Sequence, residues 1–236
     1  MYARGTTVLP QFLADDELSL TVDQANYFAF KVDDIENKQS HVNWEELATS
    51  SGAYSLKDTF DREVLTYMLS QAPSANTYGT LGAALDVGFG SGEISPLAVL
   101  NRLGRLLDEQ NVPADNRWVV APPIFWELAQ DESSKLIGID WQSSAADGSL
   151  LRNGKVLNGK IRDFTPYRSN NIPLDGSSQY QLLVGHMSST ATASQIAKVE
   201  KFRDQNSFAD VVRGLHMYGR KVLRTVALGI SHFTVD

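Results

Sequence analysis

The chain has 236 residues, a formal net charge of −7 and no cysteine. Its 42% hydrophobic and 21% charged residues are ordinary for one large globular domain or two small ones. The missing cysteine excludes disulfides, thiolate nucleophiles, Cys-ligated zinc and iron–sulfur clusters. Because the net charge is negative, the protein repels nucleic acid at long range, and any contact with DNA has to be local or indirect.

The hydrophobic stretches are too short to cross a membrane. They extend over about five to eight residues, whereas a membrane-spanning helix needs roughly 20. The chain does not open with a basic and then apolar leader. We therefore expect a soluble protein that is not exported.

The first third of the chain predicts a strand and then a long helix. Residues 18–32 alternate apolar with polar positions and are rich in β-branched and aromatic side chains, which is typical of a strand. Residues 33–71 contain no proline and begin with acidic residues, as a helix does. Gly52 is where this helix is expected to kink or split. The apolar stripe of the helix is predicted to comprise Leu47, Tyr54, Phe60, Val64, Tyr67 and Met68.

The length of this expected helix has a consequence for the shape of the protein. One helix over residues 33–71 would be about 58 Å long at 1.5 Å per residue. A compact globule of this size is only about 45 Å across. The sequence therefore predicts a plate-like or elongated subunit that completes its burial against neighbouring molecules.

A Gly-rich segment separates this helix from the next one. Residues 73–92 are rich in Gly, Ala and Ser, which predicts a loop or hinge. Ser95 as N-cap and Pro96 at the first helical position then begin a helix that ends near Asn111. The apolar face of that helix contains Leu100, Leu103 and Leu107.

The second half alternates strands with other elements. Residues 118–121 predict a short strand, and Pro122-Pro123 begins a helix that continues to about Gln130. Residues 131–153 are polar and predict a surface loop. Two Asn-Gly pairs, at 153–154 and 158–159, are typical of hairpin turns.

Further strands and one helix are expected toward the C-terminus. Residues 180–186 predict a buried strand, and residues 188–198 a modest helix. The last forty residues predict strands near Gly214 and Gly219.

Residues 88–92, GFGSG, are the strongest candidate for a ligand site. Three glycines before a helix are compatible with a phosphate-binding loop. The spacing is not that of a dinucleotide fingerprint and no clear strand precedes it, so a flexible linker is the better interpretation. A small soluble enzyme with a phosphate loop at 88–92 is kept as the alternative of another class.

The remaining polar residues favour structural roles. The histidines never occur at i, i+3 or i, i+4, and no nucleophile elbow is present, so we expect no metal, no cofactor and no catalytic residue. The histidines are His41, His186, His216 and His232. The acidic residues Asp33, Asp34, Glu36, Asp58, Asp61 and Glu63 alternate with Lys31, Lys38, Lys57 and Arg62. This alternation predicts solvated i, i+4 pairs on the outer face of the long helix instead of a carboxylate site.

The order of three segments resembles one known family. They are NRWVVAPPIFWEL at 116–128, LLRNGKVLNGKIRDFTPYRSNNIP at 150–173 and DVVRGLHMYGRKVLR at 210–224. Together they are similar to the major capsid proteins of tailed bacteriophages with the Hong Kong 97-type fold, an α+β fold with an extended loop, a long spine helix, and peripheral and axial domains. The resemblance extends over residues 18–228.

The resemblance implies a division of the chain into four parts. Residues 1–30 would be part of an extended loop and its returning strand, which overlaps a neighbouring subunit. Residues 31–92 would hold the peripheral spine helix and a hinge, residues 93–210 the axial domain, and residues 211–236 the C-terminal peripheral strand.

The resemblance also implies a function. The chain would be a non-enzymatic structural subunit that assembles into pentamers and hexamers of an icosahedral virion head. The head would be built in the host cytoplasm around double-stranded DNA, without specific DNA binding or membrane contact, and with a scaffolding protein and a portal as partners. An encapsulin-like compartment, which encloses enzymes, is the runner-up.

Two features depart from the family pattern. Met1 lies almost inside the extended loop, so an N-terminal arm expected upstream of it is not seen. Residues 1–30 contain no lysine, so we expect noncovalent overlap instead of lysine crosslinks between subunits.

Overall fold

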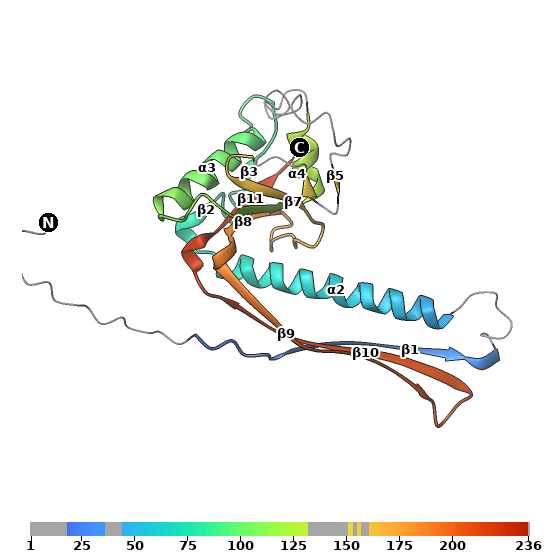
Figure 1. Cartoon of the computed structure of the whole chain (residues 1–236). Helices are drawn as coiled ribbons and strands as arrows, with labels where there is room; N and C mark the ends of the chain where they lie inside the picture. Colours follow the sequence, from blue (N-terminus) through green and yellow to red (C-terminus); the bar gives the residue numbers. More distant parts are fainter. Residues whose placement is uncertain (1–17, 36–43, 132–150, 153–154, 157–160, 236) are drawn as a thin grey trace, which may run out of the picture.

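The computed structural model describes residues 18–35, 44–131, 151–152, 155–156 and 161–235. It combines a globular unit with a long arm (Figure 1). Among the described residues, no helix is both long and apolar enough to cross a membrane.

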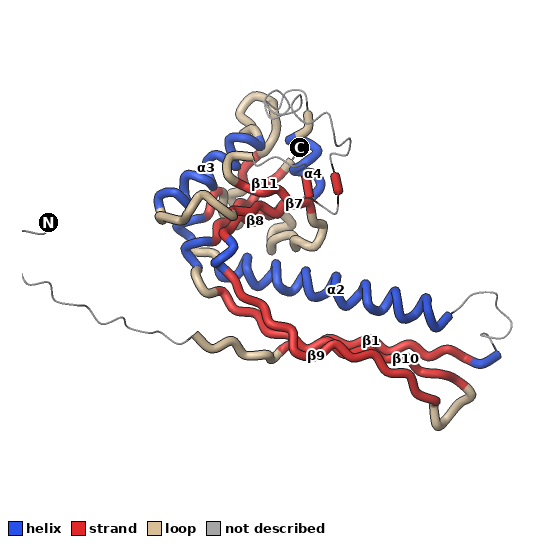
Figure 2. The backbone as a smooth tube through the Cα atoms, in the orientation of Figure 1, coloured by secondary structure: helices blue, strands red, loops and turns tan. Residues whose placement is uncertain are grey.

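The arm consists of one long helix on a three-stranded antiparallel sheet. Helix α2 extends over Trp44–Gln71, and the sheet has the order β1-β10-β9. The strands are β1 (Gln24–Asp33), β9 (Thr190–Arg203) and β10 (Ala209–Val222). Figure 2 shows α2 lying along one face of this ribbon.

The expected elongation is present, but its cause differs from the prediction. Asp33 closes strand β1, Asp34 and Ile35 are helical, and residues 36–43, which separate them from the next described helix, lie outside the described residues. Helix α2 has 28 residues, which is about 42 Å at 1.5 Å per residue. Strands β9 and β10, of 14 residues each, are about as long as the arm itself.

Helix α2 continues through Gly52 without a break. The absence of a side chain at Gly52 leaves space for an aromatic ring from β1. A Cβ at Gly52 would lie 2.6 Å from the ring of Phe28 on β1. A Cβ at Gly214 on β10 would also collide with this ring. Phe28 is therefore packed between two glycines, one on the helix and one on the neighbouring strand, and is only 8% exposed.

The predicted stripe of α2 is correct only in its C-terminal half. Val64 is buried, and the Phe60 ring packs edge-on against Tyr218 of β10, with 4.8 Å between ring centroids. Leu47 and Tyr54 lie on the opposite side of the helix and are exposed. Gly52 forms part of the packed face. An apolar-spacing pattern does not include it, because glycine has no side chain.

The globular unit is built on a mixed eight-stranded sheet. Its order is β2-β11-β8-β4-β7-β6-β5, with β3 also paired to β11. The strands are β2 (Thr77–Tyr78), β3 (Leu85–Asp86), β4 (Arg117–Ala121), β5 (Leu151–Arg152), β6 (Lys155–Val156), β7 (Phe164–Arg168), β8 (Tyr180–His186) and β11 (Leu228–Thr234). Helices α3 (Pro96–Glu109) and α4 (Pro123–Ala129) pack against it.

Several predicted elements of this unit are confirmed. Ser95 caps α3 by accepting a hydrogen bond from the Ala98 amide at 3.3 Å. The predicted strand before Pro122 is β4, and the buried strand over 180–186 is β8. Strands β5 and β6 pair with each other on either side of the first Asn-Gly pair, while both Asn-Gly pairs and most of the expected loop 131–153 lie outside the described residues.

The core of the globular unit lies between the two helices and the sheet. Leu100, Leu103 and Leu107 of α3 are fully buried, as their spacing predicts. The Trp126 ring packs edge-on against Phe125, and its Nε1 donates a hydrogen bond to the Tyr167 carbonyl at 3.1 Å. Because the core residues come from α3, α4, β4, β7, β8 and β11, this unit has its own hydrophobic core.

One expectation about secondary structure is wrong, and another is incomplete. Residues 188–198 are not a helix, since β9 begins at Thr190 and pairs along its length with β10. Pairing with a long neighbour overrides the helix preference of Ala, Gln, Lys and Glu in this stretch. Residues 73–92 are not only a loop, because Thr77–Tyr78 and Leu85–Asp86 pair in parallel with β11.

Candidate assembly surfaces

The Gly-rich loop at 88–92 encloses a carboxylate of the chain itself. The Gly90 amide donates to Glu93 Oε2 at 2.5 Å, and a Cβ at Gly88 or Gly90 would collide with this carboxylate. A bound phosphate would meet the negative charge of Glu93 in the space it has to occupy. The geometry therefore argues against the phosphate loop. It also argues against a flexible linker, because the Gly88 amide donates to the Ile94 carbonyl at 3.1 Å.

The acidic residues of α2 form surface contacts, as expected, and do not converge on a site. The Asp58 carboxylate accepts from Arg62 Nη2 at 3.1 Å and from Asn171 Nδ2 at 2.8 Å. Burial, together with the negative charge of Asp58, raises the pKa of Asp61. Glu63 Oε2 lies 3.7 Å from Arg220 Nη1 of β10.

Other members of the acidic set lie elsewhere. Asp33 is the last residue of β1 and Asp34 is the helical residue that follows it, so neither lies within α2, where the sequence interpretation expected them. Glu36 and Lys38 lie outside the described residues.

The described histidines lie in three separate places. Nδ1 of His186 is 2.8 Å from the Ser188 hydroxyl, and Nε2 of His216 is 2.9 Å from the Ser194 hydroxyl. Nδ1 of His232 is 2.8 Å from the carboxylate of Asp175. His41 is outside the described residues, and in the described part no three His, Cys, Asp or Glu are grouped to hold a metal ion.

Exposed apolar side chains concentrate on the arm. Tyr27 on β1 is 78% exposed and pairs across the sheet with Leu215 of β10, on the face turned away from Phe28 and α2. On the outer side of α2, Tyr54 is 73% exposed. Phe208, in the turn between β9 and β10, is 82% exposed. Large exposed apolar groups on a slender arm are typical of surfaces that other protein molecules cover.

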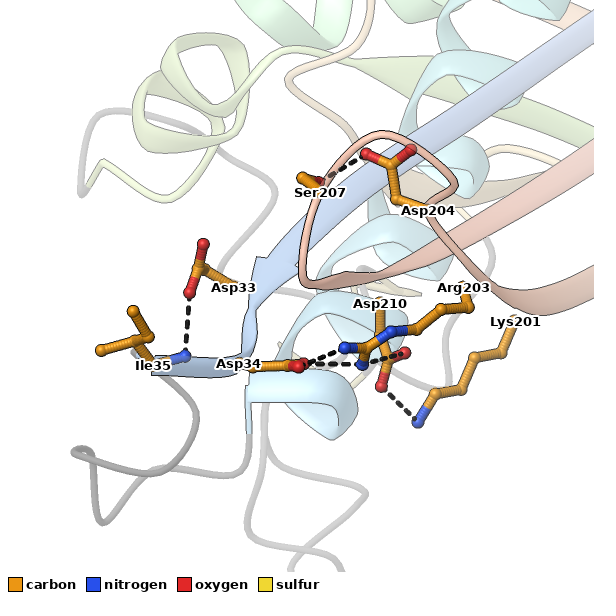
Figure 3. A network of polar contacts seen from close by, with 8 residues as sticks. All are labelled: Asp33, Asp34, Ile35, Lys201, Arg203, Asp204, Ser207 and Asp210. Atoms are coloured by element: carbon orange, nitrogen blue, oxygen red, sulfur yellow. Dashed lines mark hydrogen bonds and ion pairs between the residues drawn. The ribbon is translucent and has the colours of Figure 1, made fainter.

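The outer end of the arm carries a network of ion pairs, shown in Figure 3. Arg203 Nη1 donates to Asp34 Oδ1 at 2.8 Å and to Asp210 Oδ1 at 3.4 Å. Lys201 Nζ is 3.4 Å from Asp210 Oδ2. Hydrogen bonding to Asp34 is the main reason why the pKa of Arg203 is raised. These contacts join the end of β1 to the hairpin of β9 and β10.

A second ionic group lies farther along the sheet, on the face with Tyr27. Glu200 of β9 is paired with Lys198 and with Arg213 of β10, whose Nη2 is 2.8 Å from Oε2. Arg213 also lies 4.9 Å from the centre of the Phe202 ring. The hydrogen bond from Lys198, and then that from Arg213, lowers the pKa of Glu200 to about 2.

This pKa predicts how the sheet responds to acid. Because the pKa of Glu200 is lower in the folded chain than the ordinary 4.5, its contribution to stability is complete above pH 4.5. The contribution is lost as the pH falls toward 2. A carbon-13 titration of the glutamate carboxyls in unassembled subunits should give Glu200 a midpoint near pH 2. The Arg213→Gln variant should move this midpoint upward, and an ordinary midpoint in both proteins would contradict the pairing.

Phe208 and the ion-paired residues of β9 and β10 at the outer end of the arm were not predicted from the sequence. Residues 204–207, Asp-Gln-Asn-Ser, are a turn signal between two strands. This signal has little meaning unless residues 190–203 are already interpreted as a strand. The wrong helix prediction for 188–198 therefore concealed Phe208 as well.

The chain is similar to known proteins in structure. No family model and no curated protein sequence matches the chain. A structure from Mycobacterium phage Che8 is similar with a TM-score of 0.68 and 27% identity, over 93% of this chain and 76% of that one. The capsid structure of the cyanophage P-SCSP1u has a TM-score of 0.69 and 14% identity, over 100% of this chain and 80% of that one. The holo-SrpI encapsulin complex of Synechococcus elongatus has a TM-score of 0.58 and 13% identity, over 90% of this chain and 73% of that one.

These similarities define the class of fold. The long helix on a β ribbon and the separate globular sheet form an α+β fold, and this fold matches phage structures over nearly the whole chain. The chain has the Hong Kong 97-type fold of tailed-phage capsid proteins, as the sequence resemblance predicts.

Proposed function

We propose that the chain is the major capsid protein of a tailed bacteriophage. It is a structural subunit that assembles with copies of itself into the pentamers and hexamers of an icosahedral head. The observation that carries this proposal is the fold match to the Che8 phage structure at 27% identity and to the P-SCSP1u capsid at full coverage of this chain.

The distribution of apolar surface supports a role in assembly. Tyr27, Tyr54 and Phe208 are each more than two-thirds exposed on the arm. A subunit of a permanent shell covers such groups with neighbouring copies, in interfaces that commonly bury more than about 2,000 Å². The chain is a structural protein and not an enzyme in this proposal.

The two units of the fold support a division into the two expected domains, for which we propose changed boundaries. We assign α2 and the three-stranded sheet to the peripheral domain, and the eight-stranded sheet with α3 and α4 to the axial domain. The pairing of β9 with β10 supports an axial segment that ends near His186, and we propose this boundary in place of residue 210. β11 joins the axial sheet, although it was expected within the peripheral segment 211–236.

The remaining partners follow from the same role. The head, assembled in the host cytoplasm, encloses double-stranded DNA. The net charge of −7 limits adhesion between the subunits and DNA. DNA phosphates bind to lysine and arginine side chains, and an excess of carboxylates repels them. A scaffolding protein and a portal complete the assembly in this proposal.

An encapsulin-like compartment is the second candidate. Two similar structures support it, the SrpI encapsulin complex and a virus-like particle from Pyrococcus furiosus. Both are under 15% identical to this chain. The Che8 match is closer in sequence, and therefore we place the phage head first.

Electron microscopy of the expressed chain tests the proposal. We expect closed shells of uniform size in negative stain. Particles purified from infected cells should contain double-stranded DNA, whereas enzyme cargo identified by mass spectrometry would favour the compartment. A chain that stays monomeric at high concentration and responds to a small molecule with a thermal shift would contradict both forms of shell.

A further inference from the structure

Phe208 is the most exposed large hydrophobic side chain in the described part of the protein. It lies at the outer end of the arm, in the turn that joins β9 to β10, and is 82% exposed. The next residue, Ala209, is fully buried. The chain therefore changes from exposed to buried between Phe208 and Ala209. The aromatic ring of the turn points away from the protein.

The turn that carries Phe208 is fixed by its own polar contacts. The Asp204 carboxylate accepts hydrogen bonds from the Asn206 amide at 3.0 Å and from the Ser207 hydroxyl at 2.7 Å. It also pairs with Lys31 Nζ of β1 at 2.6 Å. These interactions, with that of Lys31 the largest, lower the pKa of Asp204, so the carboxylate stays charged and the turn stays closed in mild acid.

The backbone of Phe208 is tied to the neighbouring strand as well. The Asp34 amide donates to the Phe208 carbonyl at 3.1 Å, and the Asp34 carboxylate binds Arg203 on the other side of the turn. Figure 3 shows Asp34 between the hairpin and the end of β1. A residue whose backbone is already held at both sides loses little further backbone entropy when it binds, and this favours a strong contact.

We propose that Phe208 is an anchor residue that packs against a second copy of the chain in the assembled shell. This inference rests on the proposed function and adds the residue that makes the contact. Phe208 is the binding element, while Asp204, Asp34 and Arg203 are positioning residues.

The charges around the turn favour another copy over a nucleic acid. Lys31 is paired with Asp204, Arg203 with Asp34, and Lys201 with Asp210. A phosphate backbone would have to displace these carboxylates to reach a cation. A surface whose charges are paired internally can approach an identical surface without strong repulsion between like charges.

The first experiment measures the subunit concentration at which shells form. Removal of an aromatic anchor commonly weakens an interface at least about tenfold, so the Phe208→Ala variant should need at least about tenfold more subunit. Its circular dichroism and melting temperature should not change, because the side chain is exposed. The Phe208→Leu variant, which keeps an apolar side chain, should recover most of the assembly.

Met187 provides a matched control. It is 74% exposed and lies in the turn after β8, away from the hairpin turn that holds Phe208. The Met187→Ala variant should assemble at nearly the unmodified concentration. The proposal is overturned if Phe208→Ala stays within about twofold of the unmodified chain. It is also overturned if Met187→Ala is equally impaired, since a general loss of apolar surface would then explain both results.

A crosslinking experiment tests the contact directly. A photoreactive benzophenone amino acid in place of Phe208 should give covalent dimers after illumination of shells, and only monomers after illumination of dissociated subunits. Shells that yield no dimer would refute the contact. Failure of the unmodified chain to form any shell would instead refute the proposed function, so the two failures are distinguishable.

Discussion

The Phe28→Ala variant should lose about 3 kcal/mol of unfolding free energy, because it removes a buried ring and leaves a cavity. Phe28 is 8% exposed and fills the space between Gly52 of α2 and Gly214 of β10. No side chain is available at either glycine to refill that space. Urea denaturation of unassembled subunits should measure the loss, and hydrogen exchange should show β1 amides that exchange faster.

Tyr27 is the control for this prediction. It is adjacent to Phe28, on the same strand, but is 78% exposed on the opposite face of the sheet. The Tyr27→Ala variant should change the unfolding free energy by about 0.5 kcal/mol or less. Equal losses in the two variants would show that the ring between the glycines does not hold the helix to the sheet.

The Arg117→Met variant should lose about 2–4 kcal/mol, because it leaves buried acceptors without a donor. The Arg117 side chain is 1% exposed, and its Nε donates to the Pro113 carbonyl at 2.8 Å. Its Nη2 donates to the Val112 carbonyl and lies 2.7 Å from Asp108 Oδ1. Calorimetry of unassembled subunits should show a lower melting temperature for the globular unit.

A second arginine of the same unit provides the control. Arg105 on α3 pairs with Glu109 at 3.3 Å, but both side chains are more than half exposed. The Arg105→Met variant removes the same charge, and it should cost about 0.5 kcal/mol or less because water replaces an exposed partner. If Arg105→Met were as destabilising as Arg117→Met, net charge would account for the effect and burial would not.

The elements that were predicted correctly are those whose signals are local. Ser95 and Pro96 mark the start of α3 by capping chemistry, and the apolar run over 180–186 matches a strand buried in the middle of a sheet. The strand before Pro122 is also correct. Each of these assignments depends on residues within one turn or one strand.

The errors concern contacts between distant parts of the chain. β9 becomes a strand because β10 lies beside it, although its composition suits a helix. The position of Gly52 in α2 is explained only by Phe28, which is 24 residues away along the chain. The exposed side of α2, with Leu47 and Tyr54, was interpreted as a core stripe because apolar spacing alone does not tell a buried face from one that another molecule covers.

The surfaces for assembly were less predictable than the fold. The family resemblance indicates a shell, but it names no contact residue. Phe208 becomes conspicuous only when its exposure and the fixed turn around it are known. Side chains in an interface pack against another molecule and not against their own chain. The periodicity of one sequence therefore carries little information about them.

The hairpin of β9 and β10 also determines how the molecule responds to mechanical force. The hairpin leaves the globular sheet at the end of β8 and returns at the start of β11, and these two strands are hydrogen-bonded neighbours. Tension on the arm therefore pulls both strands in the same direction. To extract them, it has to shear β8 from β4 and β11 from β2 and β3 at once, instead of opening one strand pair at a time. A particle under internal pressure would transmit the strain of each arm into the middle of a sheet, where several ladders resist it together.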